Sequence, residues 1–401
     1  MFNHLTDITR KARRILLLSA IGAISASWVG GTAFASAGPI SATTNFDSGG
    51  GAEVAVGSFE GAGDARADAR IRVELTDPMG YPHKGYLHFK LENGADQTVF
   101  IEVTNIDDSR MPADHRLFYT TDLEKLDWRK MEHEIGNGFL FTLPSDQVYI
   151  SNYHAYPYRN IVRRVEELAR HPNVATEVIG QSHEGRDMHA IRIAAPDLDR
   201  ERAVDYVILT RQHSGEVQGS WHMDGAIDFI LDVIEDPARQ FADDYVFHLI
   251  PAANPDGIFH GIHRLDAQGH NLNRQWHAES PVEIAAIKNY LRDNVREVHW
   301  GLDLHSSTNL PFNYPAVWYD ERAVDEEALE IIEELVEAVN SFDTANATAS
   351  DSRSRGFIYR EFNAVMVTTE VSTYWPGQTA ESLREEGRAF IHATTRTVAT
   401  D

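Results

Sequence analysis

Four residues of this chain have the types and spacing needed for a zinc-dependent hydrolytic site. His213 and Glu216 lie three positions apart and His305 follows later, and each side chain offers an atom that zinc accepts as a ligand. Glu370 adds a carboxylate that could act as a general base. A cation with two imidazoles, a carboxylate ligand and one free glutamate is suited to water-driven hydrolysis of an amide or ester. We therefore predict a zinc hydrolase.

Each of these signals is weak by itself. With 19 histidines and 61 acidic residues in 401, about three His-x-x-Asp/Glu pairs are expected by chance. A lone His213/Glu216 pair is more often a hydrogen-bonded surface pair, and His305 could simply be a hydrogen-bonded histidine supported by Asp303. The position of the motif favours a site, because it follows an apolar strand and Gly215 lets the backbone turn so that both side chains face one point.

The second half of the sequence predicts an α/β sheet that brings these residues together. Apolar runs and helical periods alternate along it. The expected strands are Ala190–Ile193, Tyr206–Leu209, Tyr245–Ile250, Trp300–Leu304 and Val365–Thr368, and the expected helices are Trp221–Ile234, Pro281–Val295, Ala323–Val339 and Glu381–Thr395. Four strands run directly into polar residues, namely His213, Asn254-Pro-Asp-Gly257, His305 and Glu370. Since ligands bind at the carboxyl ends of strands in open α/β sheets, we expect these residues at one edge.

The first half, residues 44–152, predicts an antiparallel β-sandwich. Short alternating stretches are separated by glycine, aspartate and proline turns, which is typical of such sheets. These stretches are Ala69–Leu75, Tyr86–Leu91, Thr98–Val103 and Phe139–Leu143. After Tyr158 the period becomes helical, so we place the catalytic domain at residues 153–398.

Residues 1–37 have the composition of a signal peptide. Basic residues, including Arg13-Arg14, precede an apolar run from Ile15, and small residues close the segment at Ala33–Ala37. A membrane anchor is the alternative, but serines and glycines dilute the apolar run. The arginine pair could belong to a twin-arginine signal, so the export route stays open. We expect an exported protein, periplasmic or secreted, with no stable membrane association after cleavage.

The composition narrows the possible partners. The formal charge is −25, and removing residues 1–37 takes away four positive charges and one negative charge, which gives −28. So acidic a chain is not expected to bind nucleic acid or an anionic membrane surface. Cysteine is absent, which excludes disulfides, thiolate zinc sites and a cysteine nucleophile. The oligomeric state is not indicated.

In their order along the chain, these motifs resemble those of the zinc carboxypeptidase family, most closely its cytosolic carboxypeptidase branch. The resemblance covers residues 175–375. Its matching stretches are Ile179–Arg186, Arg211–Glu216, Asn254–Gly257 with Gly261, His263 and Arg264 after it, Gly269–Trp276, Asp303–His305 and Thr369-Glu370. It implies a mixed-sheet zinc carboxypeptidase domain with helices on both faces, preceded by the β-sandwich that accompanies this branch.

The resemblance also implies roles at the metal. His213, Glu216 and His305 would hold one zinc ion and leave a fourth position for water. Glu370 would be the general base, which takes a proton from this water and delivers it to the leaving amine. Arg264 would stabilise the oxyanion of the tetrahedral intermediate.

The implied substrates are the C-termini of peptides or proteins. Asn273 and Arg274 would bind the terminal carboxylate, for which the planar guanidinium is suited. Two positions depart from the branch: Ser214 stands where proline is usual, and Asn271 stands where aspartate is common. The tyrosine that the family has in its pocket finds no secure counterpart in residues 344–359.

Specificity is predicted from an arginine near the expected pocket floor. Arg355 lies fifteen residues before Glu370, and a buried guanidinium there would favour a C-terminal glutamate or aspartate. Arg353 and Arg360 compete for this role, and a solvated loop arginine is the plain alternative.

Other functions fit parts of the pattern. A zinc-dependent deacylase or amidase acting on N-acyl amino acids or on cell-wall peptides would use similar ligands. A non-catalytic binding module with an inert metal site is an alternative of another class. A serine hydrolase is weaker, because Gly180–Gly185 lacks the glycine two residues after the serine that a nucleophile elbow requires.

Overall fold

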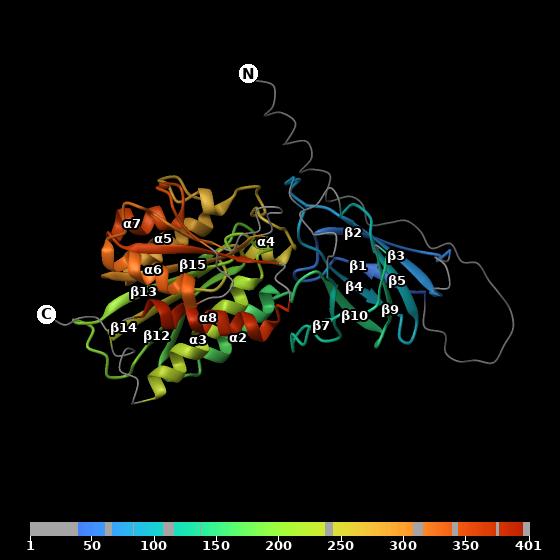
Figure 1. Cartoon of the computed structure of the whole chain (residues 1–401), viewed down its shortest axis with the longest axis horizontal. Coiled ribbons are helices and arrows are strands. Elements are labelled where there is room, and N and C mark those ends of the chain that lie inside the picture. Colours follow the sequence, from blue (N-terminus) through green and yellow to red (C-terminus); the bar gives the residue numbers. More distant parts are fainter. Residues whose placement is uncertain are drawn as a thin grey trace, which may run out of the picture. The chain divides into compact units, whose positions relative to one another are not determined.

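Strands dominate the first part of the described chain and alternate with helices in the second (Figure 1). The computed structural model describes residues 39–60, 66–82, 84–106, 116–136, 138–236, 244–307, 316–338, 344–373 and 377–395. The predicted signal peptide, residues 1–37, lies outside these ranges. Within them, no helix has both the length and the apolar composition that crossing a membrane requires.

The N-terminal part contains two five-stranded sheets. One has the order β1-β4-β10-β6-β7 and the other the order β2-β3-β5-β9-β8. Their bounds are β1 Ser41–Thr43, β2 Ala52–Gly57, β3 Ala69–Leu75, β4 His88–Glu92, β5 Thr98–Val103, β6 Phe118–Thr120, β7 Arg129–Lys130, β8 Glu134–Ile135, β9 Gly138–Thr142 and β10 Gln147–Ser151. In β3 the apolar side chains are buried and the charged ones between them are more exposed, which is the expected period of two.

The predicted antiparallel arrangement holds for these sheets with one exception. Strands β3 and β5 pair in parallel. The reason is that β4, which lies between them in the sequence, joins the other sheet, so β5 returns in the direction of β3.

The C-terminal part is built on one mixed eight-stranded sheet, with the order β11-β12-β14-β13-β15-β18-β16-β17. Its bounds are β11 Val174–Gln181, β12 Asp187–Ala194, β13 Val204–Thr210, β14 Tyr245–Ile250, β15 Val298–Ser307, β16 Ala316–Tyr319, β17 Thr344–Ala347 and β18 Val365–Ser372. The four central strands β14, β13, β15 and β18 run parallel. Their carboxyl ends therefore lie at the same edge of the sheet.

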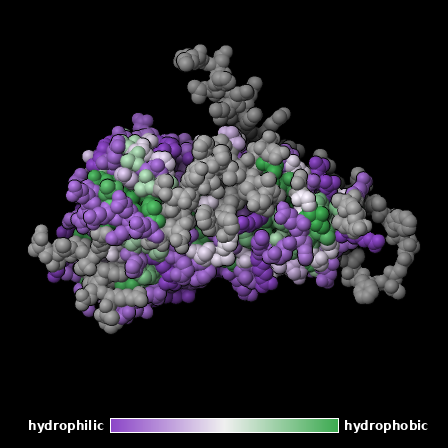
Figure 2. All heavy atoms as spheres, viewed as in Figure 1, coloured by the Kyte–Doolittle hydropathy of each residue, from purple (hydrophilic) through white to green (hydrophobic). Residues whose placement is uncertain are grey.

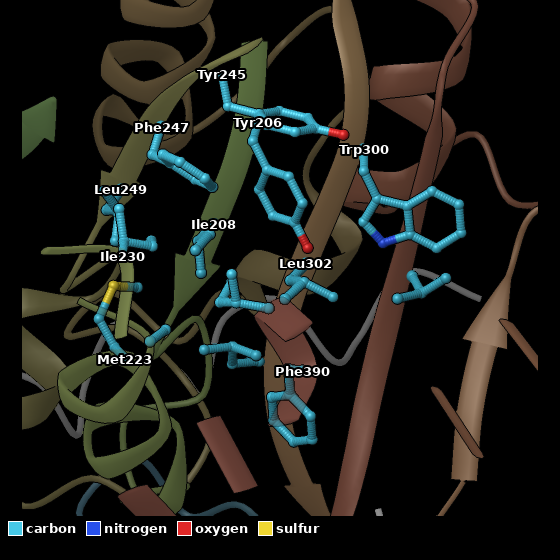
Figure 3. Close-up of a cluster of buried hydrophobic side chains, with 14 of the residues drawn as sticks. Tyr206, Ile208, Met223, Ile230, Tyr245, Phe247, Leu249, Trp300, Leu302 and Phe390 are labelled. Atoms are coloured by element: carbon cyan, nitrogen blue, oxygen red, sulfur yellow. The ribbon is translucent and has the colours of Figure 1, made fainter. Parts of the chain in front are cut away.

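Helices cover both faces of this sheet, as predicted. Their bounds are α2 Tyr158–Leu168, α3 Gln218–Glu235, α4 Pro255–Phe259, α5 Val282–Asn294, α6 Glu326–Ala338, α7 Ser354–Phe362 and α8 Ala380–Thr394, with a short 3₁₀ helix η4 at Leu272–Arg274. Tyr206 and Ile208 of β13 pack toward α2, α3, α6 and α8 (Figure 3). Their neighbours Val207 and Leu209 pack toward α5 and α7. Both faces of β13 are thus buried, which explains its continuous apolar run.

The predicted helices agree with α3, α5, α6 and α8 to within a few residues at each end. The predicted strands agree less well at their ends, because β15 continues to Ser307 and β18 to Ser372. His305 and Glu370 therefore lie within strands β15 and β18, near their carboxyl ends, and not in the loops that follow these strands. Strands β11, β16 and β17 were not anticipated from the sequence.

The surface is mainly hydrophilic in the view of Figure 2. The large hydrophobic side chains that are exposed among the described residues belong to five different elements: Val56, Ile135, Val178, Val282 and Leu329. This scattered pattern agrees with the acidic composition.

Candidate metal centre

The loop after β13 is held by a buried arginine. Arg211 adopts the left-handed backbone region, with φ of 61°, and reverses the chain immediately after the strand. Its guanidinium donates to the carbonyl oxygens of Ser214 and Tyr156 and to the hydroxyl of Ser220. Only glycine fits at position 215, because a Cβ there would lie 2.8 Å from the Nδ1 atom of His263. The loop that carries His213 and Glu216 is therefore fixed on both sides.

The three predicted metal ligands converge on one point. The Nδ1 atom of His213 lies 2.7 Å from Oε1 of Glu216, and the Nδ1 atom of His305 lies 2.6 Å from Oε2 of the same carboxylate. The three ligand atoms lie within 4.8 Å of one another, and all three residues are buried. Two imidazole nitrogens and one carboxylate oxygen form a donor set that fits zinc.

The outer nitrogens of both histidines have oxygen partners. The Nε2 atom of His213 lies 3.0 Å from Oδ1 of Asn271, and that of His305 lies 3.2 Å from Oδ1 of Asp303. A proton on each Nε2 would leave Nδ1 free to bind a metal, which is how such outer partners fix the tautomer of a ligand histidine. Asp303 in turn accepts hydrogen bonds from Gln212 and from Ser354.

The buried carboxylates of Glu216 and Asp303 favour a positive charge at the centre. Burial opposes ionisation, but the facing histidines hold the pKa of Glu216 well below its usual value. Burial also opposes protonation of His305, but Asp303 and Glu216 raise its pKa well above the ordinary range. The two carboxylates thus favour a positive charge at this position, which a bound metal ion would supply, since a ligand imidazole binds in its neutral form.

Glu370 lies beside the ligands without belonging to their cluster. It is the register partner of His305 between β15 and β18. Burial and the charge of Glu216 raise its pKa to about 7. A carboxylate with a pKa near neutrality is suited to accepting and returning a proton. Arg264 also lies next to the candidate ligands, with its Nη1 atom 3.7 Å from Oε1 of Glu216.

The predicted substrate-binding residues lie on the 3₁₀ helix η4. Asn273 is buried, and its Nδ2 atom lies 3.2 Å from Nε2 of His305. Arg274 donates to the carbonyl oxygen of Asn273. Burial, Arg353 and Arg264 lower the pKa of Arg274 to about 10. Several guanidinium groups therefore lie close enough to repel one another, and an anion would relieve that repulsion.

The structure separates the three arginines that competed for the specificity pocket. Arg355 is 1% exposed, and its Nη1 and Nη2 atoms each lie 3.4 Å from an oxygen, of Thr368 and Thr348 respectively. Its Nε atom has no hydrogen-bond partner, and the described residues form no ion pair with it. Burial and Arg355 lower the pKa of Arg353, which also faces Glu370.

Arg360 points away from this group. Its guanidinium donates to the carboxylate of Asp351 and to the carbonyl oxygen of Trp276. The same helix carries Tyr359, whose ring lies 5.0 Å from the guanidinium of Arg322. The structure therefore leaves Arg355 and Arg353 as the pocket candidates, and it gives Tyr359 a partner on the surface.

Some contributors to the site were not predicted from the sequence. Gln212 bridges Asp303 and Trp276, accepting a hydrogen bond of 2.6 Å from the indole nitrogen. Its place beside His213 was the available signal. Ser182 of the apparent nucleophile elbow lies in the turn between β11 and β12 and donates to Asp256, so the elbow geometry of a serine hydrolase is not formed there.

Comparisons with known proteins agree with this geometry. A family model described as zinc carboxypeptidase matches residues 161–373. The chain is 28% identical over 251 residues to an uncharacterized protein of Zymomonas mobilis, which covers 60% of this chain and 63% of that protein. It is 29% identical over 213 residues to cytosolic carboxypeptidase 6 of Caenorhabditis elegans, covering 51% of this chain and 45% of that protein. The chain thus spans less than two thirds of these relatives.

Solved structures show a similar fold. A metallo-carboxypeptidase from Burkholderia cenocepacia superimposes with a TM-score of 0.72 and 22% identity, covering 88% of this chain and 97% of that chain. A metallo-carboxypeptidase from Pseudomonas aeruginosa gives a TM-score of 0.66 and 21% identity, with 88% and 98% coverage. The similarity extends over both the N-terminal sheets and the eight-stranded sheet, as the coverage of this chain requires.

Proposed function

The chain belongs to the zinc carboxypeptidase family, and from this premise we propose that it is a metallocarboxypeptidase that removes C-terminal residues from peptides or proteins and uses one zinc ion. The observation that carries the proposal is the buried His213–Glu216–His305 cluster with Glu370 beside it. The leader expected in residues 1–37 places such an enzyme outside the cytoplasm, in the periplasm or secreted.

The residues of the centre divide the chemistry between them. A bound zinc ion would supply Lewis-acid polarisation of the scissile carbonyl and a water of lowered pKa. Glu370 accepts a proton from the attacking water and returns it to the leaving amine nitrogen. Arg264 would donate to the carbonyl oxygen as negative charge develops on it, and it lies next to Glu216, one of the residues that would hold the metal.

The substrate is held by its terminal carboxylate. Arg274 and Asn273 lie next to each other on η4, and Asn273 reaches His305. A carboxylate bound there would place the last amide bond of a peptide next to the centre. Positioning of this kind removes much of the entropic cost of the reaction.

We further propose a preference for glutamate or aspartate at the C-terminus. Arg355 is buried and forms no ion pair among the described residues, although the charges of Asp303 and Asp320 act on it from farther away. A buried charge without a close counter-charge is costly, so a substrate carboxylate would be favoured in contact with it. Arg353, which also faces Glu370, adds positive charge to the same region.

One experiment tests the proposal. The purified chain without residues 1–37 is analysed for bound metal and incubated with peptides ending in Glu, Asp, Lys and Phe and with N-acyl glutamate, with and without a chelator. We expect zinc near one equivalent and chelator-sensitive release of Glu and Asp. Cleavage of N-acyl glutamate alone would indicate a deacylase, a preference for Phe would contradict the acidic pocket, and absence of metal would remove the central claim.

A further inference from the structure

The connection between β3 and β4 forms a tight turn that fixes the backbone of a tyrosine. The carboxylate of Asp77 accepts hydrogen bonds from the backbone N–H groups of Met79, at 2.9 Å, and Tyr81, at 3.0 Å. Gly80 lies between them with φ of 70°, which glycine adopts without strain. Tyr81 therefore has a defined place, although it belongs to the N-terminal part of the chain.

This turn lies against the segment that carries Arg264, the residue proposed to stabilise the oxyanion. Burial raises the pKa of the Asp77 carboxyl, and a hydrogen bond from the backbone of His263 lowers it by a smaller amount. The backbone of His263 therefore faces this carboxylate. A Cβ built on Gly85 would lie 3.1 Å from Cε1 of His263, so the chain after the turn also meets this histidine. Arg264 is the next residue in the sequence.

A second contact joins the turn to the substrate clamp. The Cε atom of Met79 lies 3.7 Å from the place that a Cβ would take on Gly269. Gly269 opens the stretch that leads to Asn273 and Arg274. The turn thus lies beside Arg264 and beside the start of the segment that leads to Asn273 and Arg274.

The ring of Tyr81 faces Arg264. The guanidinium carbon lies 5.8 Å from the ring centre, within the range of a cation–π contact. The Nη1 atom of Arg264 also lies 3.7 Å from Oε1 of Glu216. The Nε atom of Arg264 is buried and has no hydrogen-bond partner in the described structure. The ring and the carboxylate are therefore two contacts that can orient this guanidinium.

We propose that Tyr81 is a positioning residue that holds Arg264 in the orientation needed to stabilise the oxyanion. A free arginine side chain has many rotamers, and a donor helps the transition state most when its orientation is fixed beforehand. The N-terminal sheets would then complete the active site through this turn. The inference rests on the proposed function, since it assigns a partner to a residue of that reaction.

The kinetic test compares two substitutions of the same residue. Tyr81→Phe keeps the aromatic face and Tyr81→Leu removes it. We expect Tyr81→Leu to lower kcat about tenfold with little change in KM, as loss of a partly buried cation–π contact allows, and Tyr81→Phe to stay near the parent. Tyr149→Leu is the matched control, because Tyr149 also faces a cation, Lys90 at 6.0 Å, but lies on β10 away from the site. An equal loss in Tyr81→Phe and Tyr81→Leu would overturn the role of the ring.

A double-mutant cycle shows whether Tyr81 acts through Arg264. In an Arg264→Ala background, Tyr81→Leu is expected to cause no further loss of kcat. Additive losses would overturn the inference. The same four proteins are unfolded with denaturant after removal of metal, where we expect a coupling between the two substitutions in the free energy of unfolding.

The unfolding cycle keeps the two proposals distinguishable. If the parent protein hydrolyses no peptide, the proposed function fails, while the coupling in the metal-free protein still reports on the contact between Tyr81 and Arg264. Independent effects of the two substitutions on unfolding would overturn the inference whether or not the protein is active.

Discussion

His305 and Glu370 are direct partners in the parallel ladder between β15 and β18. Side chains at paired positions project from the same face of a sheet, and a slip of one residue would turn one of them to the other face. The alternation agrees, because Leu304 and Val371 pack in the core on the opposite face. The backbone register therefore holds a candidate metal ligand beside the proposed general base.

Glu370→Gln is expected to abolish most activity while leaving the metal in place. The amide cannot accept a proton from water, and loss of a general base typically costs about 10²- to 10⁴-fold in rate. Measurement of kcat and of zinc content separates the two effects. Glu333→Gln, at an exposed position of α6, is the matched control and should retain full activity. Loss of zinc from Glu370→Gln would assign this residue to the metal instead.

The stability of the metal-free protein should report the raised pKa of Glu370. Burial and Glu216 raise this pKa from 4.5 to about 7. Between these two pH values the carboxyl of Glu370 is therefore protonated in the folded protein and ionised in the unfolded chain. The contribution of this protonated carboxyl to the free energy of unfolding is fully present below the unfolded pKa and disappears as pH rises through about 7. We expect the melting temperature of metal-free Glu370→Gln to rise relative to the parent as pH increases over this window. A pH-independent difference would contradict the raised pKa.

Removal of either histidine ligand should remove the metal. His213→Ala and His305→Ala each delete one nitrogen donor from the cluster of three, and we expect the zinc content to fall far below that of the parent. His133→Ala provides the control, since His133 is exposed in the N-terminal part. Zinc that remains in both ligand variants would show that the cluster is not the binding site.

The clustering of the three candidate ligands could be predicted from the sequence because their signals are local. His213 and Glu216 follow an apolar run within a short glycine-containing loop, and the eight-stranded sheet has central parallel strands where such runs occur. The helices α5 and α8 were found because their apolar positions repeat with a helical period. Burial against the sheet then confirms what that period indicates.

The parts that could not be predicted depend on contacts between distant segments. Strand β17 pairs only with β16, so its existence depends on a neighbour and not on its own composition. Arg353, Arg355 and Arg360 lie within a single short stretch of the sequence, and only packing decides that Arg355 is buried while Arg360 reaches Asp351. Tyr81 lies some 180 residues before Arg264 in the sequence, a separation that local patterns cannot bridge.

Substitution of Arg355 should change specificity and not general activity. Arg355→Leu removes the buried guanidinium, and we expect kcat/KM for peptides ending in Glu to fall roughly a hundredfold, as for loss of one partner of a buried charge pair. Peptides ending in Leu should be affected little or should improve. Arg360→Leu is the matched control, because this arginine pairs with Asp351 at the surface. An equal loss for all C-termini would indicate a structural role.

Asp205 should stabilise the fold in a pH-dependent way at the end of β13 remote from the metal loop. It is fully buried, and Nε2 of His248 lies 2.9 Å and Nη2 of Arg200 2.8 Å from its carboxylate. Burial opposes ionisation, but these partners and the backbone of Arg296 lower its pKa. The stabilisation is therefore present above the unfolded pKa of about 4 and is lost as pH falls through the folded value.

Asp205→Asn is accordingly expected to destabilise the protein by about 1.5–3 kcal/mol near pH 7, since it removes the charged acceptor of the hydrogen bonds from Arg200, which is partly exposed, and from the backbone of Arg296. The difference from the parent should narrow as pH falls below about 4 and toward the lowered folded pKa, where the native carboxyl also becomes neutral. Denaturant unfolding at both pH values measures it, with exposed Asp197→Asn as the control. A constant difference at the two pH values would show that hydrogen-bond geometry, and not charge, accounts for the effect. Zinc content should stay unchanged, because the candidate ligands His213 and Glu216 follow the opposite end of this strand and His305 lies near the end of β15.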